Sequence, residues 1–461
     1  MSYAYPDSLP DVIEQRWALA DLGGLVKAPL PSREEMLAVI HVAFQASLLS
    51  EEGRPVRFRI VLCDPEDLND DFEVRGRNRA LVFSESRPLT VPEIVRLAPA
   101  ADPSQTLIGV GSDDRAALWI WGLVDAGLSW WEFVRGERGD RLSSSPPPER
   151  FTVSSSRRGS VTVSRGGRVV CRLQRGELTA APPGEPGMFV DFIGLHPRAL
   201  RGLLAPSDAF TRGPFGTFLQ PITTAFYLEV LDQLRATSYD EHGRDEDYPK
   251  TFLIQFIERI LMRVRETSHG GTVLLVPESW RHGDPRLQDR LAIKYPMDDM
   301  GVWPALLRAI RAHHRYYDLI FPAWDGADVG QQEFRQILYA DQEMTEAADL
   351  VRDRANLIAS LCSVDGAVVL TDRLRILGFG AEIVAQSPTL KGVVIADDAE
   401  AAVTRSCPIE DFGTRHRSAF RFCSSDQQVA AFVVSQDGDV RAILGVGTEV
   451  VMWPSVRALH E

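Results

Sequence analysis

Two short strings near the C-terminal end combine charged groups with very small residues, a pairing that could do chemistry. The first is Asp365-Gly366-Ala367, directly before the apolar run Val368-Val369-Leu370. Asp365 supplies a carboxylate that can hold Mg²⁺ or accept a proton from a hydroxyl group. Gly366 and Ala367 have almost no side chain, so a planar ligand can lie against their backbone. This string therefore predicts a ligand-facing turn before a strand.

The second string is Gly413-Thr414-Arg415-His416-Arg417-Ser418, directly before Ala419-Phe420-Arg421-Phe422. Thr414 and the backbone amides at a helix start form an anion-binding end. Arg415 and Arg417 flank it with guanidinium groups, which suit phosphate oxygens best. His416 points in another direction, because successive helical residues diverge. Taken singly, each string is more often structural, as a strand-leading turn or a solvated helix start. Together they predict a polyphosphate site with a metal-binding carboxylate.

The order of these strings resembles the diadenylate cyclase family. Asp-Gly-Ala and Arg-His-Arg are the two signatures of that family, and both are intact here, followed by a strand at 432–436. Members condense two ATP molecules into cyclic di-AMP. The chain looks most like the branch in which a cyclase-like domain follows a different N-terminal region, and some members of that branch are proposed to be nucleotide sensors.

The resemblance implies a role for each matched residue. Asp365 would hold Mg²⁺ or Mn²⁺ and help to deprotonate the 3′-hydroxyl of ATP. Arg415 and Arg417 would neutralise phosphates, and Gly380-Ala381-Glu382 falls where the family places backbone contacts to adenine. The candidate catalytic residues are Asp365, Arg415 and Arg417, with Asp365 also the metal ligand; the candidate nucleotide-binding residues are Gly366, Ala367, Ala381, Glu382, Gly413, Thr414, His416, Ser418 and Ser435. We expect His416 to support the site more than to touch ligand.

Two features depart from the family pattern. Asp365 and Arg415 lie about fifty residues apart, which is longer than is usual, so we expect an insertion at 385–411 to loop out. The insertion is acidic, and negative charge beside a polyphosphate is unfavourable unless it faces solvent or metal. Gln436 stands where many cyclases have a metal-ligating Glu, which puts metal affinity in doubt without excluding turnover.

The composition excludes several classes of protein. The 461 residues are 44% hydrophobic and 25% charged, as in globular proteins of two or three domains. A net charge of −14 argues against general binding of nucleic acid or acidic membranes. The five cysteines lack a Cys-x-x-Cys spacing, which indicates free thiols and no zinc site. Without a signal-like start or a run of about 18 apolar residues, we expect a cytoplasmic protein.

The first half of the chain predicts a mixed domain with a β-rich centre. A helix begins at Ser32-Arg33-Glu34-Glu35 with apolar residues at helical spacing after it, and a second, proline-led helix covers 92–97. Strands are expected at 57–62, 106–110, 117–123, 160–164 and 168–173, the last two joined by Gly166-Gly167 as a hairpin. No catalytic spacing is recognisable in this half.

Two further groups of side chains have a functional and a structural interpretation. Trp119, Trp121, Trp130 and Trp131 could stack on a base, but aromatic residues at alternating strand positions more often pack a sheet. His313-His314 could suggest a metal site, but adjacent helical histidines point about 100° apart and cannot chelate one ion together. The structural interpretation is favoured for both groups.

The second half predicts the domain that carries both strings. Proline and glycine cluster at 205–220 and indicate a boundary. A helix at 252–261 then ends at His269-Gly270-Gly271 and leads into a buried strand at 272–277. Extra helices are expected within 280–340. We therefore predict a mixed α+β domain at 1–215 and, at 216–461, an α/β domain with a twisted mixed sheet flanked by helices and its site at strand ends.

Three functions follow from these patterns. The first is a diadenylate cyclase, a nucleotidyltransferase that binds ATP and acts as a homodimer or larger oligomer, because each of two ATP-loaded domains must present its nucleotide to the other. The second is a catalytically silent sensor of an adenine nucleotide in a signalling or defence system. The third is a structural protein with a chance motif match. Binding of ATP separates the third from the others, and formation of cyclic di-AMP separates the first from the second.

Overall fold

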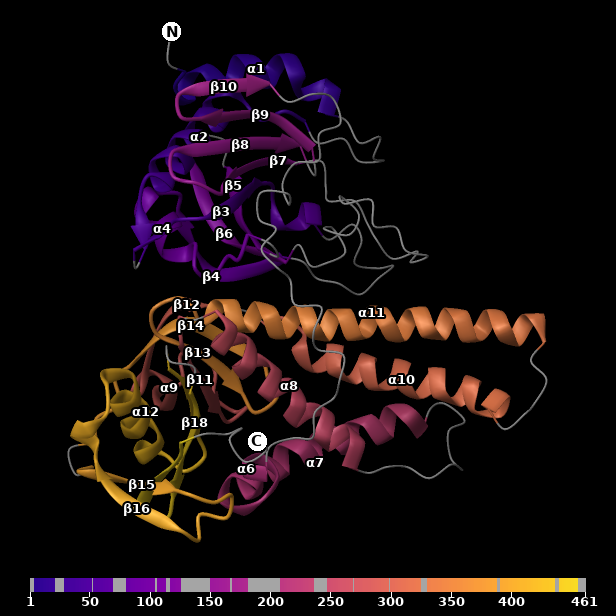
Figure 1. The fold of residues 1–461 in the computed structure, drawn as a ribbon, viewed down its shortest axis with the longest axis vertical. Coiled ribbons are helices and arrows are strands. Elements are labelled where there is room, and N and C mark those ends of the chain that lie inside the picture. The colour runs from indigo at the N-terminus through magenta and orange to yellow at the C-terminus, as the bar shows by residue number, and fades with distance from the viewer. Residues whose placement is uncertain are drawn as a thin grey trace. The chain divides into compact units, whose positions relative to one another are not determined.

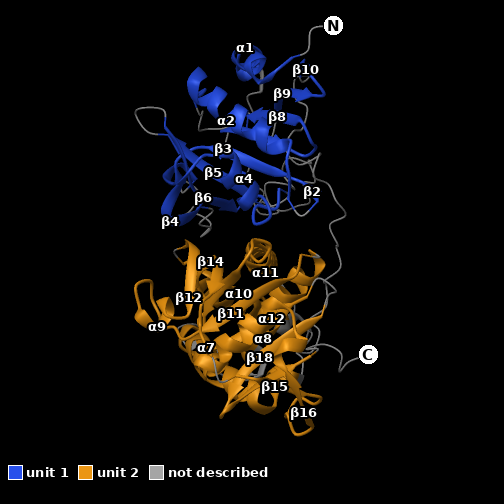
Figure 2. Ribbon diagram, turned by 90° about the vertical axis from the view of Figure 1, so that its left-hand side faces the viewer, with its two compact units in different colours: residues 1–199 blue, residues 200–461 orange. Residues whose placement is uncertain are grey.

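The computed structural model divides the chain into two compact units, residues 1–199 and 200–461 (Figure 2). The residues that the structure describes are 4–20, 29–51, 53–68, 80–103, 106–112, 117–125, 150–165, 168–180, 208–235, 247–267, 269–297, 299–324, 330–387, 390–435 and 439–454. The fold is mixed α/β, as predicted, with one large sheet in each unit.

The N-terminal unit is built on a sheet with helices packed against β7, β8 and β9 (Figure 1). Its described helices are η1 (Pro6–Ser8), α1 (Leu9–Arg16), η2 (Trp17–Ala20), α2 (Arg33–Ser47), η3 (Pro65–Leu68) and α4 (Val91–Leu97). Its described strands are β1 (Ser50–Glu51), β2 (Arg54–Pro55), β3 (Phe58–Leu62), β4 (Ala80–Pro88), β5 (Thr106–Ser112), β6 (Leu118–Asp125), β7 (Phe151–Ser155), β8 (Ser160–Arg165), β9 (Arg168–Gln174) and β10 (Glu177–Ala180). The main sheet has the order β10-β9-β8-β7-β3-β5-β6-β4, and β1 pairs only with β2.

Local sequence signals account for the N-terminal elements. The hydroxyl of Ser32 accepts a hydrogen bond from the backbone N–H of Glu35, and the Glu35 carboxylate accepts one from the N–H of Ser32, so α2 begins with a complete capping box. β8 and β9 form the predicted antiparallel hairpin. The turn residues Gly166 and Gly167 lie outside the described residues.

The C-terminal unit has a larger sheet, with the described strands in the order β12-β14-β13-β11-β17-β18-β19-β15-β16. Its strands are β11 (Gly271–Val276), β12 (Leu291–Pro296), β13 (Ala367–Thr371), β14 (Ile376–Ile383), β15 (Gly392–Ala396), β16 (Thr404–Pro408), β17 (Ala430–Val434), β18 (Val440–Val446) and β19 (Glu449–Trp453). Its helices are α6 (Asp208–Thr211), α7 (Gly213–Arg235), α8 (Asp247–Glu266), α9 (Pro285–Gln288), α10 (Val302–Trp324), α11 (Gln331–Leu361), η5 (Ile409–Asp411) and α12 (Thr414–Ser425). β11 is parallel to β13 and antiparallel to β17, so the sheet is mixed.

Helices cover both faces of this sheet (Figure 1). On one face, α12 buries Phe420 and Phe422 in a core with Val433 and Val369. On the other face, the rings of Phe210 and Phe215, from α6 and α7, pack against Phe432. Because side chains alternate along a strand, the neighbours Phe432 and Val433 belong to opposite faces. The predicted α/β arrangement with helices on both faces is confirmed.

One sequence expectation differs from the structure. The insertion at 385–411 does not loop out, because its residues form β15 and β16, and β15 pairs in parallel with β19. Within the proline- and glycine-rich stretch at 205–220, α7 begins at Gly213 and includes Pro221 inside the helix. The two compact units divide at 199/200, and the domain boundary at 215/216 stays a prediction.

Candidate nucleotide site

The pairing of five strands places the first sequence string at the same edge of the C-terminal sheet as Ser435 and Arg441. Ala381 pairs with Ala367, Ala367 with Thr272, Thr272 with Val433 and Val433 with Arg441. Residues in one such row point to the same face of the sheet. The three strand spacings from Ala367 to Arg441 give a row about 14 Å long. Asp365 lies two residues before this row and Ser435 two residues after it, so both stand at the same sheet edge.

Asp365 is exposed at the start of β13 and forms no hydrogen bond or ion pair with another described residue. It follows the C-terminal turn of α11, which ends at Leu361 with Cys362 as its cap. The chain then turns at Gly366, where φ is 116°. Helix α11 therefore delivers a free carboxylate to the sheet edge, as the sequence predicts.

The small size of Gly366 has a cause within the fold. A Cβ atom at this position would lie 2.5 Å from the carbonyl carbon of Gly380 and 2.8 Å from the backbone nitrogen of Ala381. The strand β14 thus passes directly against the turn. Ala367 and Ala381 are themselves buried, each 2% exposed, so a ligand could reach their backbone but not their side chains. Glu382, the next residue, is exposed.

The second string opens α12, as predicted. Gly413 is the N-cap, no side chain caps the helix, and a Cβ atom at Gly413 would meet nothing within 4 Å. Open space therefore lies in front of the positively polarised helix end. Thr414 and Arg415 are exposed, and Arg415 forms no hydrogen bond or ion pair with a described residue. Half-buried Arg417 donates a 3.5 Å hydrogen bond to the Thr414 hydroxyl, and Ser418 is also half-buried.

The charge of Arg415 affects the pKa values of two neighbouring side chains, Cys362 and His416. Burial raises the pKa of the Cys362 thiol, at the end of α11, to about 12, and the Arg415 charge opposes that rise. Arg415 also helps to lower the pKa of His416. The guanidinium therefore acts on the turn that precedes Asp365 as well as on its own helix.

His416 faces the protein interior, with 9% of its surface exposed. Its Nε2 lies 3.0 Å from Nη1 of Arg441 on β18. Nη2 of Arg441 donates to Asp439 at 3.2 Å. The backbone N–H of Asp439 donates to the Ser435 hydroxyl at 3.1 Å, and the N–H of Ser435 donates to the Asp439 carbonyl at 2.9 Å. A continuous polar chain thus links α12, β18 and the end of β17.

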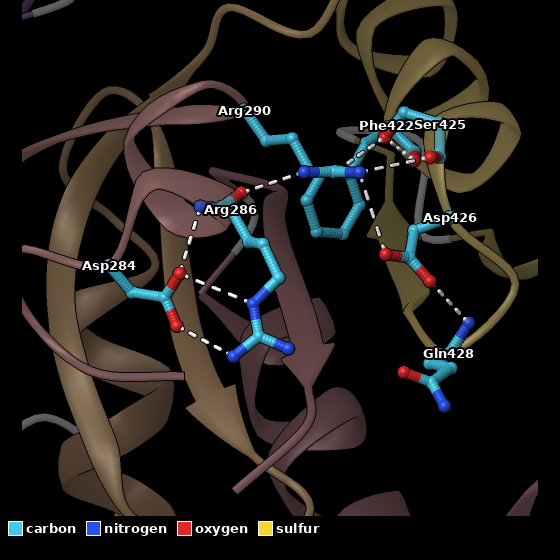
Figure 3. Close-up of polar contacts among 7 residues, drawn as sticks. All are labelled: Asp284, Arg286, Arg290, Phe422, Ser425, Asp426 and Gln428. Carbon is cyan, nitrogen blue, oxygen red and sulfur yellow. Dashed lines mark hydrogen bonds and ion pairs between the residues drawn. The ribbon is translucent and has the colours of Figure 1, made fainter. Parts of the chain in front are cut away.

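The opposite end of α12 is held by Arg290, as Figure 3 shows. Its Nε donates to the Ser425 hydroxyl at 3.1 Å, and Nη2 donates to the Ser425 carbonyl at 3.2 Å. The same nitrogen lies 3.5 Å from the Asp426 carboxylate. A cation at a helix C-terminus also complements the helix dipole. Arginines from elsewhere in the unit therefore fix α12 at both ends.

Asp365 is the candidate ligand for a divalent cation. Among the described residues, no three His, Cys, Asp or Glu side chains gather as a metal-binding group. Mg²⁺ is commonly held by one or two carboxylates together with substrate phosphates. The exposed Asp365 carboxylate has no hydrogen bond or ion pair within the described part of the chain and stands at an edge that also carries Arg415, which fits that mode of binding.

Among the remaining sequence candidates that the structure describes, the tryptophans of β6 pack in the N-terminal core. Trp121 is 4% exposed and donates from its ring nitrogen to the Cys63 carbonyl at 2.8 Å, while Trp119 packs against the same core. Trp130 and Trp131 lie outside the described residues, as does Gln436. His313 and His314 have ring centroids 6.0 Å apart. Asp397 and Asp398, two acidic residues of the insertion, stand at the β15–β16 turn. There the Asp398 carboxylate accepts hydrogen bonds from the backbone N–H groups of Ala402 and Val403.

Sequence reasoning missed Arg441, Asp439 and Arg290. The available signal for Arg441 was one arginine within the apolar strand run Val440–Leu444, which begins five residues after Ser435. No comparable signal marks Arg290, because its contact with Ser425 joins residues 135 positions apart.

Comparison with known proteins gives one match, in the N-terminal unit. Residues 25–125 match a family model described as "Probable sensor domain DACNV". No curated protein and no solved structure matches the chain. The DACNV match covers α2 and the strands from β1 to β6, and it ends before β7. It gives a sensor description to the half of the chain in which the sequence showed no catalytic spacing.

No helix among the described residues is long and apolar enough to cross a membrane.

Proposed function

We propose that residues 200–461 bind ATP at the edge formed by Asp365, Ser435 and the first turn of α12, and condense two ATP molecules into cyclic di-AMP. The observation that carries the proposal is the row from Ala381 through Ala367, Thr272 and Val433 to Arg441. The row starts beside Asp-Gly-Ala and ends at Arg441, which contacts His416 of Arg-His-Arg at 3.0 Å, so it links two strings that are about fifty residues apart in sequence. A chance motif match gives no reason for that convergence.

The reaction assigns separate tasks to the two strings. The 3′-oxygen of one ATP forms a bond to the α-phosphorus of the other, the bond from that phosphorus to pyrophosphate breaks, and the same exchange in the opposite direction closes the ring. Asp365 accepts the proton that leaves the 3′-hydroxyl. Arg415, Arg417 and the amides at the start of α12 offset the charge on the phosphates and on departing pyrophosphate.

Mg²⁺ or Mn²⁺ held by Asp365 would neutralise part of the phosphate charge. The exposed position of Asp365 and Arg415 suits a reaction between two subunits, since the edge must face a second ATP-loaded copy. The active form is therefore a homodimer or a larger assembly that contains such pairs.

A second candidate is supported by the sensor description of residues 25–125. In that candidate the C-terminal edge binds an adenine nucleotide without turning it over. In the first candidate, the N-terminal unit instead adjusts a synthase in response to its own signal.

The deciding experiment incubates the full chain with ATP and Mg²⁺ or Mn²⁺ and measures cyclic di-AMP by chromatography and mass spectrometry. We expect product from the wild type and none from Asp365→Asn, with both proteins binding ATP in calorimetry. ATP binding without product at any protein concentration would favour the sensor. An absence of ATP binding would overturn the nucleotide site itself.

A further inference from the structure

His416 stands between Arg415 and Arg417 in the second string and contacts Arg441 on the sheet. Arg441 stands on β18, and both of its terminal nitrogens are occupied, one by His416 at 3.0 Å and one by Asp439 at 3.2 Å. Its Nε is buried and has no hydrogen-bond partner within the described residues. The guanidinium is therefore held by the same polar groups that border the site.

The direction of this hydrogen bond fixes the state of the imidazole. Arginine can only donate, so Nε2 of His416 must be the acceptor, and the ring is neutral with its proton on Nδ1. Burial, then the charges of Arg441 and Arg415, lower the pKa of His416 to about 4, while Asp439 acts in the opposite direction. Near pH 7 the imidazole therefore adds no charge between the arginines.

Aromatic rings hold the other side of His416. Its ring centroid lies 6.0 Å from that of Phe412 and 6.4 Å from that of Phe420. The imidazole is thus enclosed between β18 and an apolar wall, with little surface exposed. Its role is that of a fixed spacer between the sheet and the first turn of α12.

A fixed spacer at this position has a geometric consequence for the flanking residues. Successive residues on an α-helix are rotated by about 100°. Once His416 is held toward β18, Arg415 and Arg417 must point to either side of that direction. Rotation of the first turn would move both guanidinium groups together. The orientation of the phosphate-binding pair is therefore set by the contact of its central residue with the sheet.

We propose that Arg441 is a positioning residue for the nucleotide site, acting through His416 to fix the rotation of the first turn of α12 and so the directions of Arg415 and Arg417. This inference rests on the proposed nucleotide function. It adds that the signature is completed by a residue on a neighbouring strand, which touches neither nucleotide nor metal.

The test compares Arg441→Met, which keeps the apolar stem, with Arg441→Lys, which keeps a donor and the charge. The probe is 3′-deoxy-ATP, which has no attacking hydroxyl and stays intact during calorimetry. We expect Arg441→Met to weaken its binding about tenfold or more, the scale of one charge-assisted hydrogen bond, and Arg441→Lys to recover part of the loss. Arg405→Met is the matched control, because Arg405 is an exposed arginine on β16 at the far end of the sheet.

A second readout does not depend on nucleotide binding. In Arg441→Met, the pKa of His416, followed by NMR of the ring, should rise above about 4, because the charge of Arg441 is the second cause of the lowering, after burial. If the wild type does not bind 3′-deoxy-ATP, the proposed function fails, while the His416 titration still tests the contact. Wild-type affinity in Arg441→Met, or an unchanged His416 pKa, would overturn the positioning role. If Arg441→Met does not fold, Arg441→Gln, which is polar but shorter and uncharged, carries both measurements, and wild-type values in that variant would equally oppose the positioning role.

Discussion

Among single residues, Arg415 gives the most direct test of the site. Its guanidinium is exposed and has no hydrogen bond or ion pair with a described residue, so its removal leaves no buried partner unsatisfied. We expect Arg415→Ala to reduce the free energy of ATP binding by roughly 1.5–3 kcal/mol, the scale of a hydrogen bond to a charged group. Calorimetry measures the dissociation constant. Arg405→Ala, at the far end of the sheet, should leave it unchanged, and an unaltered value in Arg415→Ala would remove Arg415 from the site.

Gly366 is constrained by the chain as well as by any ligand. It combines a φ of 116° with the backbone of Gly380 and Ala381 in the space of a Cβ atom. Gly447 also has a positive φ, of 61°, but a Cβ atom there would meet nothing. We expect Gly447→Ala to lower the free energy of unfolding by about 1–2 kcal/mol, the cost of the left-handed conformation, and Gly366→Ala to lower it by more. Chemical denaturation compares the two, and equal losses would mean that the β14 contact is easily relaxed.

His416 should make stability depend on pH. Its pKa is about 4 in the fold and near 6.5 in the unfolded chain. Between these values the unfolded state binds the proton and the folded state does not. The contribution of neutral His416 to the free energy of unfolding is therefore complete above about pH 6.5 and is lost as the pH falls toward 4. The difference in unfolding free energy between wild type and His416→Gln, measured at several pH values, isolates this contribution from that of the carboxylates. A pH-independent difference would contradict the assigned pKa.

At the scale of elements, the position of α12 depends on contacts at both of its ends. Arg290 reaches the Ser425 carbonyl and hydroxyl, whereas Arg286, on helix α9, forms its ion pair with nearby Asp284 at 2.8 Å (Figure 3) and lies 6.0 Å from the centre of the Trp280 ring. Arg290→Met should lower the free energy of unfolding by about 1.5–3 kcal/mol, and Arg286→Met by no more than the value of an exposed ion pair, about 0.2–1 kcal/mol. Hydrogen exchange in the last turn of α12 should rise only in the first variant. Equal effects of the two substitutions would mean that Arg290 does not anchor the helix.

Helices and strands with local sequence signals could be predicted from the sequence. Periodic apolar runs with clear ends, such as 33–47 and 272–276, gave the right elements because their signals are local. The insertion was expected to loop out, but β15 joins the sheet beside β19. A run such as Gly392–Ala396 can be read as a short strand that pairs locally with β16, but its pairing with β19 joins residues more than fifty positions apart. Long-range pairing of this kind leaves no local pattern.

The sequence predicted which elements carry the candidate residues but not the tertiary contacts among them. Asp365 and Arg415 stand where their strings indicate, because motif residues at element starts follow from local signals. The sequence indicated that His416 supports the site and does not bind the ligand. It did not identify the partner Arg441, because the two residues meet only when α12 packs on the sheet. The close approach of β14 to Gly366 is likewise a tertiary fact.

At the scale of the whole molecule, the chain joins a region that matches a probable sensor domain to a unit that carries the candidate site. A free Asp365 carboxylate and an uncapped α12 at one exposed edge are groups that lack protein partners within the described part of the chain. Such an edge can be completed by a ligand, by a second copy of the chain, or by both. The synthase requires both at once, because one edge holds one ATP.

The synthase therefore predicts a dependence of rate on assembly that the sensor does not. Cyclic di-AMP formed per chain should rise with protein concentration and level off once pairs are complete. A mixture of Asp365→Asn and Arg415→Ala chains should stay largely inactive, because each mixed pair lacks one group needed in every complete cycle. Sedimentation with bound ATP gives the assembly state under the same conditions. A monomer that binds ATP and forms no product at high concentration would exclude the synthase, and the sensor would then account for the site.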